Sequence, residues 1–250
     1  MKKNIVLTVI VFFTCFSVKA QTTKKTENVN QVWFTYINQL RFSNKWELTT
    51  DLNLRTLDGF VNDFSVSIVR FGLTYYLAPN TKLTAGYAWA NFFPTGNHKY
   101  ISQTEHRPWQ QIQWITKYGN KAMRQGIRLE ERFRSKILND STLAGGYNFN
   151  YRIRYALLYE IPLGKKENVA GAISLILGDE VMLNFGKEVV YNYFDQNRFY
   201  AGFKLQTGKY TNLQLGYLNV FQQLPAGNKY LINNGIRLTC AQNFDLRKKK

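Results

Sequence analysis

The chain has 250 residues, a formal net charge of +17, 16% aromatic residues, five prolines and two cysteines. The aromatic content and the scarcity of proline exclude an intrinsically disordered chain. A charge this positive indicates an anionic partner, of which nucleic acid is the common one.

The first 20 residues have the three-part organisation of a cleavable signal peptide. Two lysines follow Met1, an apolar run covers residues 5–16, and small or branched residues precede Ala20. A run of this length is too short to cross the roughly 30 Å of a bilayer as a helix. Cleavage after Ala20 leaves 230 residues (250 − 20) and removes three lysines, so that the mature charge is +14. Export rules out nucleic acid as the partner and favours lipopolysaccharide or acidic solutes.

The exported part is dominated by alternation of apolar and polar residues with a period of two. Over residues 149–161 one face reads Phe, Tyr, Ile, Tyr, Leu, Tyr, Ile, while the other carries Asn, Arg, Arg, Ala, Leu and Glu. Successive side chains of a strand point to opposite faces, so the pattern predicts strands with one apolar face. A second clear case is residues 46–55. Weaker copies lie near 31–42, 64–77, 82–92, 109–118, 123–134, 170–184, 197–207, 212–222 and 230–244.

The connections alternate between short and long. Short links are expected near residues 43–44, 78–80, 119–120 and 208–209, and long loops at 56–63, 93–108, 135–148 and 186–196. Short periplasmic turns and long outer loops are typical of outer-membrane barrels. About eleven strands can be counted, but bacterial single-chain barrels have an even number, and Thr22–Asn30 looks too polar for a further strand. The expected fold is an all-β, antiparallel, up-and-down transmembrane β-barrel of ten or twelve strands.

The predicted organisation is a signal peptide (1–20), a polar N-terminal segment (21–30), a barrel in the outer membrane (31–246) and a basic tail (247–250). A soluble sandwich or lipocalin-like barrel with an apolar interior is the alternative. Arg, Glu, Gln and Gly on the polar faces, and aromatic residues near strand ends, favour the membrane barrel. Ile236, Leu238, Cys240 and Phe244 share one face, and the aromatic residue that closes this row resembles the C-terminal signal read by barrel-assembly machinery, although residues 247–250 extend beyond it.

The polar faces are expected to line the lumen and to gather arginines near its outer mouth. An arginine-lined lumen would suit a porin-like passive channel or a binding barrel for small anionic solutes, because guanidinium groups fit carboxylates and phosphates. Alternatively, arginine and glutamate pair across the barrel and plug it, leaving a structural, lipopolysaccharide-binding or partner-binding role. By parity Glu131 would face lipid. The candidate lumen residues are Arg55, Arg128, Glu130, Arg132, Arg134, Arg152, Arg154, Glu180 and Arg198.

An outer-membrane lipid hydrolase is the rival class of function. The chain has only two histidines, His98 and His106, both within the expected loop 93–108. Glu105 adjoins His106, but neighbours in a loop do not make a catalytic triad. Cys240 is expected to face lipid, and no metal-ligand spacing or phosphate-binding glycine loop is present. The sequence therefore predicts no catalytic residue, no metal and no cofactor.

Several motifs, taken in order, resemble an uncharacterised outer-membrane family, domain-of-unknown-function family 2490. The resemblance runs from Trp33 to the C-terminus and implies an exported barrel with no agreed activity. The motifs are Arg128-Leu129-Glu130-Glu131-Arg132-Phe133, Asp179-Glu180-Val181, Asn184-Phe185-Gly186, Phe194-Asp195-Gln196-Asn197-Arg198 and Leu215-Gly216-Tyr217.

Overall fold

The computed structural model describes residues 24–57, 63–96, 98–164 and 169–247. The predicted signal peptide, and most of the predicted basic tail, lie outside these ranges. The described residues contain no helix with the length and apolar character needed to cross a membrane.

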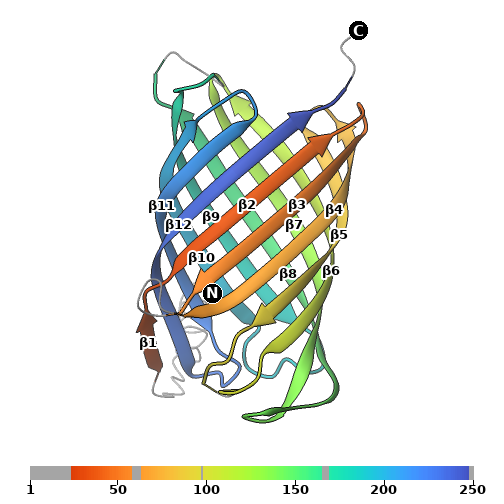
Figure 1. Cartoon of the computed structure of the whole chain (residues 1–250), viewed down its shortest axis with the longest axis vertical. Helices are drawn as coiled ribbons and strands as arrows, with labels where there is room; N and C mark the ends of the chain where they lie inside the picture. Colours follow the sequence, from red (N-terminus) through yellow and green to blue (C-terminus); the bar gives the residue numbers. More distant parts are fainter. Residues whose placement is uncertain (1–23, 58–62, 97, 165–168, 248–250) are drawn as a thin grey trace, which may run out of the picture.

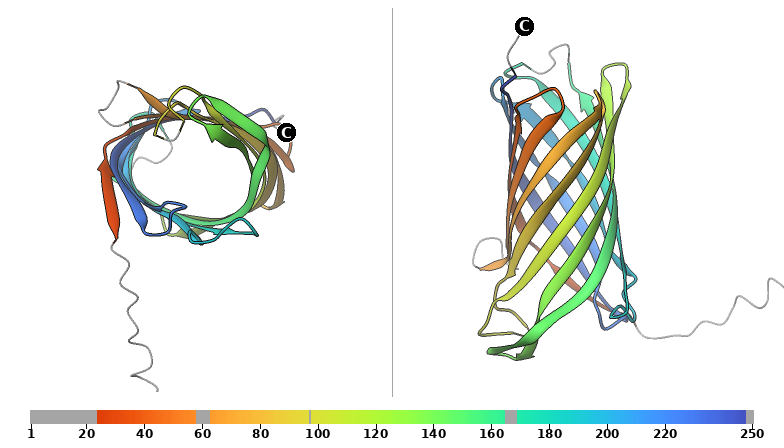
Figure 2. Two further views of the ribbon diagram at one scale, coloured as in Figure 1. Left: turned by 90° about the horizontal axis from the view of Figure 1, so that it is seen from below. Right: turned by 90° about the vertical axis from the view of Figure 1, so that its right-hand side faces the viewer.

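The described chain forms twelve strands in one closed sheet (Figure 1). Strands β2 to β12 follow one another around the ring, each antiparallel to its predecessor, and Figure 2 shows the ring end-on. The predicted all-β, antiparallel, up-and-down barrel is thereby confirmed. The strands are β1 (Lys25–Val29), β2 (Val32–Arg41), β3 (Trp46–Thr56), β4 (Phe64–Ala78), β5 (Thr81–Phe92), β6 (Gln103–Tyr118), β7 (Lys121–Asn139), β8 (Thr142–Pro162), β9 (Ile173–Phe185), β10 (Phe194–Gln206), β11 (Thr211–Gln223) and β12 (Lys229–Asp245).

The ring closes through a parallel seam. The second part of β12 pairs with β2 from Ile236↔Val32 to Asp245↔Arg41, and its first part pairs in the same direction with β1. Because β2 and β12 run in the same direction, the ring itself has eleven strands, and β1 is the twelfth. The total agrees with the larger expected count, but the rule of an even ring does not hold. The expectation that residues 22–30 form no strand is wrong, since β1 lies within them.

The wall is apolar outside and charged inside. The outward side chains Phe71, Phe203 and Leu215 are 50%, 56% and 55% exposed, whereas Glu105 and Glu130 are 0% and 1% exposed. Alternation along each strand places these two classes on opposite faces. The apolar interior expected of the alternative barrel is therefore not observed around these carboxylates.

The connections lie at two ends of the barrel. Tight links at 42–45, 79–80, 119–120 and 207–210, together with the longer β8–β9 link, define what we call the short-turn end, where β12 also ends (Figure 1). The other links define the long-loop end. Two loop predictions are wrong in extent: β6 already begins at Gln103, and β7 and β8 continue to a turn at residues 140–141. The paired register of β7 and β8 through Asn139↔Thr142 explains the second error, because the two strands keep pairing here although the segment lacks regular alternation of apolar and polar residues.

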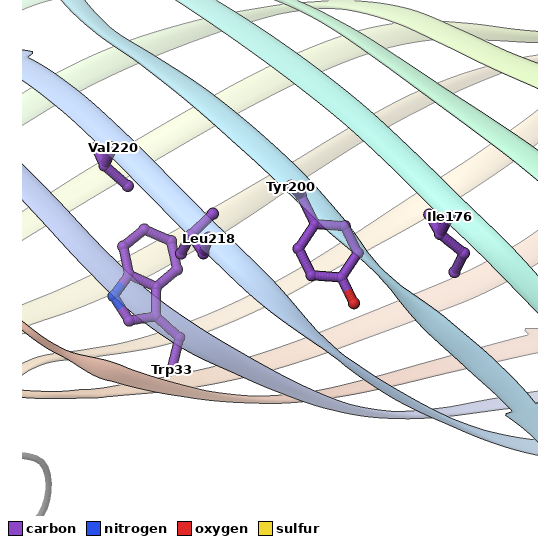
Figure 3. Close-up of a cluster of buried hydrophobic side chains, with 5 residues drawn as sticks. All are labelled: Trp33, Ile176, Tyr200, Leu218 and Val220. Atoms are coloured by element: carbon purple, nitrogen blue, oxygen red, sulfur yellow. The ribbon is translucent and has the colours of Figure 1, made fainter.

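Inside the wall, two large aromatic side chains lie flat on glycine pairs. A Cβ atom at Gly86 would approach the Trp109 ring to 2.7 Å, and one at Gly216 would approach the Tyr200 ring to 2.8 Å. Glycine is therefore needed for close approach of ring and wall. Figure 3 shows Tyr200 in a buried cluster with Trp33, Ile176, Leu218 and Val220.

Candidate functional site: the charged lumen

Glu105, near the long-loop end of β6, is the first centre of a buried charge network. Its carboxylate accepts hydrogen bonds from Arg132, with Nε–Oε1 at 2.7 Å and Nη2–Oε2 at 3.1 Å, and from Arg134 Nε at 2.5 Å. Arg107, two residues along the same strand, also donates to it. Three guanidinium groups thus converge on one carboxylate that is fully shielded from solvent.

Glu130 on β7 is the second centre. Arg152 Nε donates to its Oε2 at 2.7 Å and Arg154 Nη2 donates to its Oε1 at 3.0 Å, while Arg128 Nη1 lies 3.8 Å away. Arg152 continues the network, because its Nη1 donates to Asp195 Oδ2 at 2.9 Å. Opposite charges alternate from β7 through β8 to β10.

Glu180 on β9 is the third centre. Arg154 Nη1 and Arg198 Nη1 each donate to it at 3.0 Å, one to each carboxylate oxygen. Arg132 of the first centre also donates through Nη1 to Asn184, on the same strand as Glu180, at 3.4 Å. The ion pairs form two groups, one on Glu105 and one through Glu130, Asp195 and Glu180, and together these contain seven arginines and four carboxylates, which we call the charge network. Its members are Glu105, Arg107, Arg128, Glu130, Arg132, Arg134, Arg152, Arg154, Glu180, Asp195 and Arg198.

Strand register produces these contacts. Glu130 pairs directly with Arg152 across β7 and β8, and Glu180 pairs with Arg198 across β9 and β10. Side chains at paired positions share a face and come within reach of one another. Because these positions lie on the inward face of each strand, the paired side chains meet in the lumen and connect neighbouring strands.

Arginines outnumber carboxylates in the lumen, and three of them lie over tryptophan rings. The Trp33 ring lies between the Arg55 guanidinium, at 3.7 Å from its centroid, and that of Arg198, at 5.1 Å. Arg128 lies 4.3 Å from the centroid of Trp109. A cation over an aromatic face is attracted by the ring quadrupole, most strongly by tryptophan.

The structure places all nine predicted lumen residues in the interior. Eight belong to the charge network. The ninth, Arg55, lies over the Trp33 ring, which Arg198 of the network also contacts. The sequence pattern does not identify Glu105, Arg107 and Asp195, because they fall in the predicted loops 93–108 and 186–196. The signal that could have found them is parity: Glu105 and Arg107 continue the inward set of β6.

These side chains project into the long-loop half of the lumen. Arg107, Arg152 and Asp195 are buried, and so is Arg132, which reaches both Glu105 and Asn184. Buried charges must be paired, and each of these four takes part in an ion pair.

The short-turn half contains a cavity instead. It has a volume of about 550 Å³, and its lining includes Lys117, Lys121, Arg124, Lys204, Glu160, Lys209 and Arg237. Glu160 accepts from Lys204. We call it the short-turn cavity. None of its other basic residues lies within 4 Å of a carboxylate that the structure describes.

The two histidines lie apart from the charged lumen. His106 faces outward, where its Nδ1 contacts the Tyr87 hydroxyl and its ring meets that of Tyr147, while its neighbour Glu105 points inward. His98 Nδ1 lies 2.8 Å from the Ile101 carbonyl oxygen. No histidine–carboxylate hydrogen bond, and no group of three metal-ligating side chains, occurs in the described part of the chain.

The sequence of the barrel matches a known protein family. The model of the family described as "Protein of unknown function (DUF2490)" matches residues 30–231. The chain belongs to this family. The match spans the barrel from the start of β2 to the first residues of β12, so the DUF2490 region and the ring nearly coincide. The predicted family is confirmed. No curated protein and no solved structure matches the chain.

Proposed function

We propose that this protein is an outer-membrane β-barrel with a sealed lumen, acting as a membrane-embedded binding protein and not as an open diffusion channel. The observation that carries the proposal is the charge network, which places paired, buried side chains in the long-loop half of the lumen.

The membrane location is supported by the outward face. Every strand of the ring is 10 residues or longer, and the outward positions are rich in exposed Leu, Ile, Phe and Tyr. A tilted strand of about 9–11 residues spans the hydrocarbon. In water this apolar surface would promote aggregation, whereas in a bilayer it would contact the hydrocarbon chains of the lipids. The proposal includes export by a signal peptide cleaved after Ala20, insertion by barrel-assembly machinery, and lipopolysaccharide as a surrounding lipid.

A passive channel for small anions is the alternative function. It would require an aqueous path through the charge network, and opening one would break several carboxylate–arginine pairs. Breaking a single buried pair costs about 3–5 kcal/mol. Seven arginines around four carboxylates leave an excess of positive charge, which would select anions if such a path opened. A hydrolase has less support, because Glu105 is bound by arginines and faces away from His106.

Solute uptake tests the proposal. Refolded protein is placed in liposomes, its folded state is checked by heat-modifiable gel migration, and osmotic swelling is measured in arabinose and in a monovalent organic anion. A sealed barrel gives swelling rates equal to those of protein-free liposomes in both solutes. Protein-dependent swelling that is faster in the anion would overturn the proposal in favour of the channel.

A further inference from the structure

We propose that the short-turn cavity is a binding site for a small solute carrying two or more phosphate or carboxylate groups. The site uses none of the charge-network residues and lies at the opposite mouth of the barrel. Its placement toward the periplasm rests on the proposed outer-membrane location, since outer-membrane barrels have their short turns on the periplasmic side, whereas its binding chemistry does not.

The size and charge of the cavity define the ligand class. Ligand pockets have volumes of about 300–1,000 Å³, and this one has about 550 Å³. Lys117, Lys121, Arg124, Lys209 and Arg237 line it without a carboxylate partner, since the lining acid Glu160 is taken by Lys204. Five uncompensated positive charges around one volume favour an oxyanion with several negative charges.

Arg237 provides an independent observation at the inner end of the cavity. Its guanidinium lies over the Tyr200 ring, 4.1 Å from the centroid, and its buried Nε has no hydrogen-bond partner. The Tyr200 hydroxyl is also buried and unpartnered. A buried donor left without an acceptor costs about 1–3 kcal/mol. An anionic oxygen reaching this position would satisfy Arg237.

A second, smaller cavity deepens the same region. It has a volume of about 120 Å³ and is lined by Trp33, Glu180, Arg198, Tyr200 and Arg237 among others. Arg237 borders both volumes, and Glu180 and Arg198 of the charge network line the smaller one, so Arg237 separates the short-turn cavity from the network. A ligand would therefore enter at the short-turn mouth and stop at Arg237.

Calorimetry in a neutral detergent tests the proposal with pyrophosphate and citrate as probes and glycerol as the neutral reference. The cavity variant combines Lys121→Glu with Arg124→Glu, two solvent-accessible positions. The control combines Lys99→Glu with Lys187→Glu, which make the same charge change at exposed positions of the long-loop end. Heat-modifiable migration shows that each variant is folded.

The wild type is expected to bind pyrophosphate, citrate or both, and not glycerol. The tighter probe identifies phosphate or carboxylate as the preferred group. Affinity should fall at least ten-fold in the cavity variant and stay within two-fold in the control. Arg237→Gln should also weaken binding. Failure of the wild type to bind either probe, or equal losses in the two double variants, would overturn the proposal. Liposome swelling is independent of this result, so the sealed lumen and the binding site can fail separately.

Discussion

Replacing Glu105 with glutamine should be among the most destabilising single changes in the barrel. The substitution keeps the side-chain size but removes the negative charge on which Arg107, Arg132 and Arg134 converge. Three buried guanidinium groups would then repel one another with no counter-charge, since Glu130 and Asp195 are already engaged by Arg152.

The expected loss is about 3–5 kcal/mol, the cost of breaking a buried ion pair by removing one partner. Unfolding by urea in detergent micelles, followed by fluorescence of the five tryptophans, measures it. Glu27→Gln is the matched control, because this exposed residue of β1 has the same chemistry outside the network. A second variant combining Glu105→Gln with Arg132→Gln should recover part of the loss, since it removes one unpaired charge. A loss below 1 kcal/mol for Glu105→Gln, or one equal to that of Glu27→Gln, would refute the reasoning.

Three other changes test the wall and the seam. Gly86→Val should destabilise the fold by about 1–3 kcal/mol through overpacking against Trp109, whereas Gly145→Ala, which meets nothing within 4 Å, should have no measurable effect in the same urea titration. Leu215→Arg should lower the free energy of unfolding in a lipid bilayer by about 2–4 kcal/mol, because it places a charge on the outward face. The same substitution at its inward neighbour, Gln214→Arg, should lower it by less than about 1 kcal/mol. Equal losses would contradict a lipid-facing wall. Deleting residues 21–29 should leave heat-modifiable migration intact, because β2 alone closes the ring against β12; loss of the folded band would show that β1 is required.

Much of the wall could be predicted from the sequence, because strand parity is a local property. Residues 149–161 assign one apolar and one polar face unaided, and the structure places Ile153 outward and Arg152 inward. The same parity located Glu130, Arg154 and Glu180 in the lumen before any partner was known. Their pairing depends on register between strands, which the pattern of a single strand does not contain.

The missed parts depend on long-range geometry. Glu105 and Asp195 lie in polar segments whose strand character comes from pairing with β7 and with β9 and β11, not from apolar alternation. The parallel seam joins residues about 200 positions apart, and its register allows an odd ring that a count of alternating segments cannot distinguish from an even one. The short-turn cavity likewise depends on which side chains cluster inside the barrel, such as Trp33 and Tyr200.

Single-channel recording across a planar bilayer tests the sealed lumen most directly. Wild-type protein is compared with a variant carrying Arg132→Ala and Arg152→Ala, which removes the guanidinium group that contacts Glu105 and Asn184 and the one that joins Glu130 to Asp195. The account predicts a silent wild type and discrete current steps from the variant, whose steps also show that the barrel inserts. Steady, anion-preferring current through the folded wild type would contradict it.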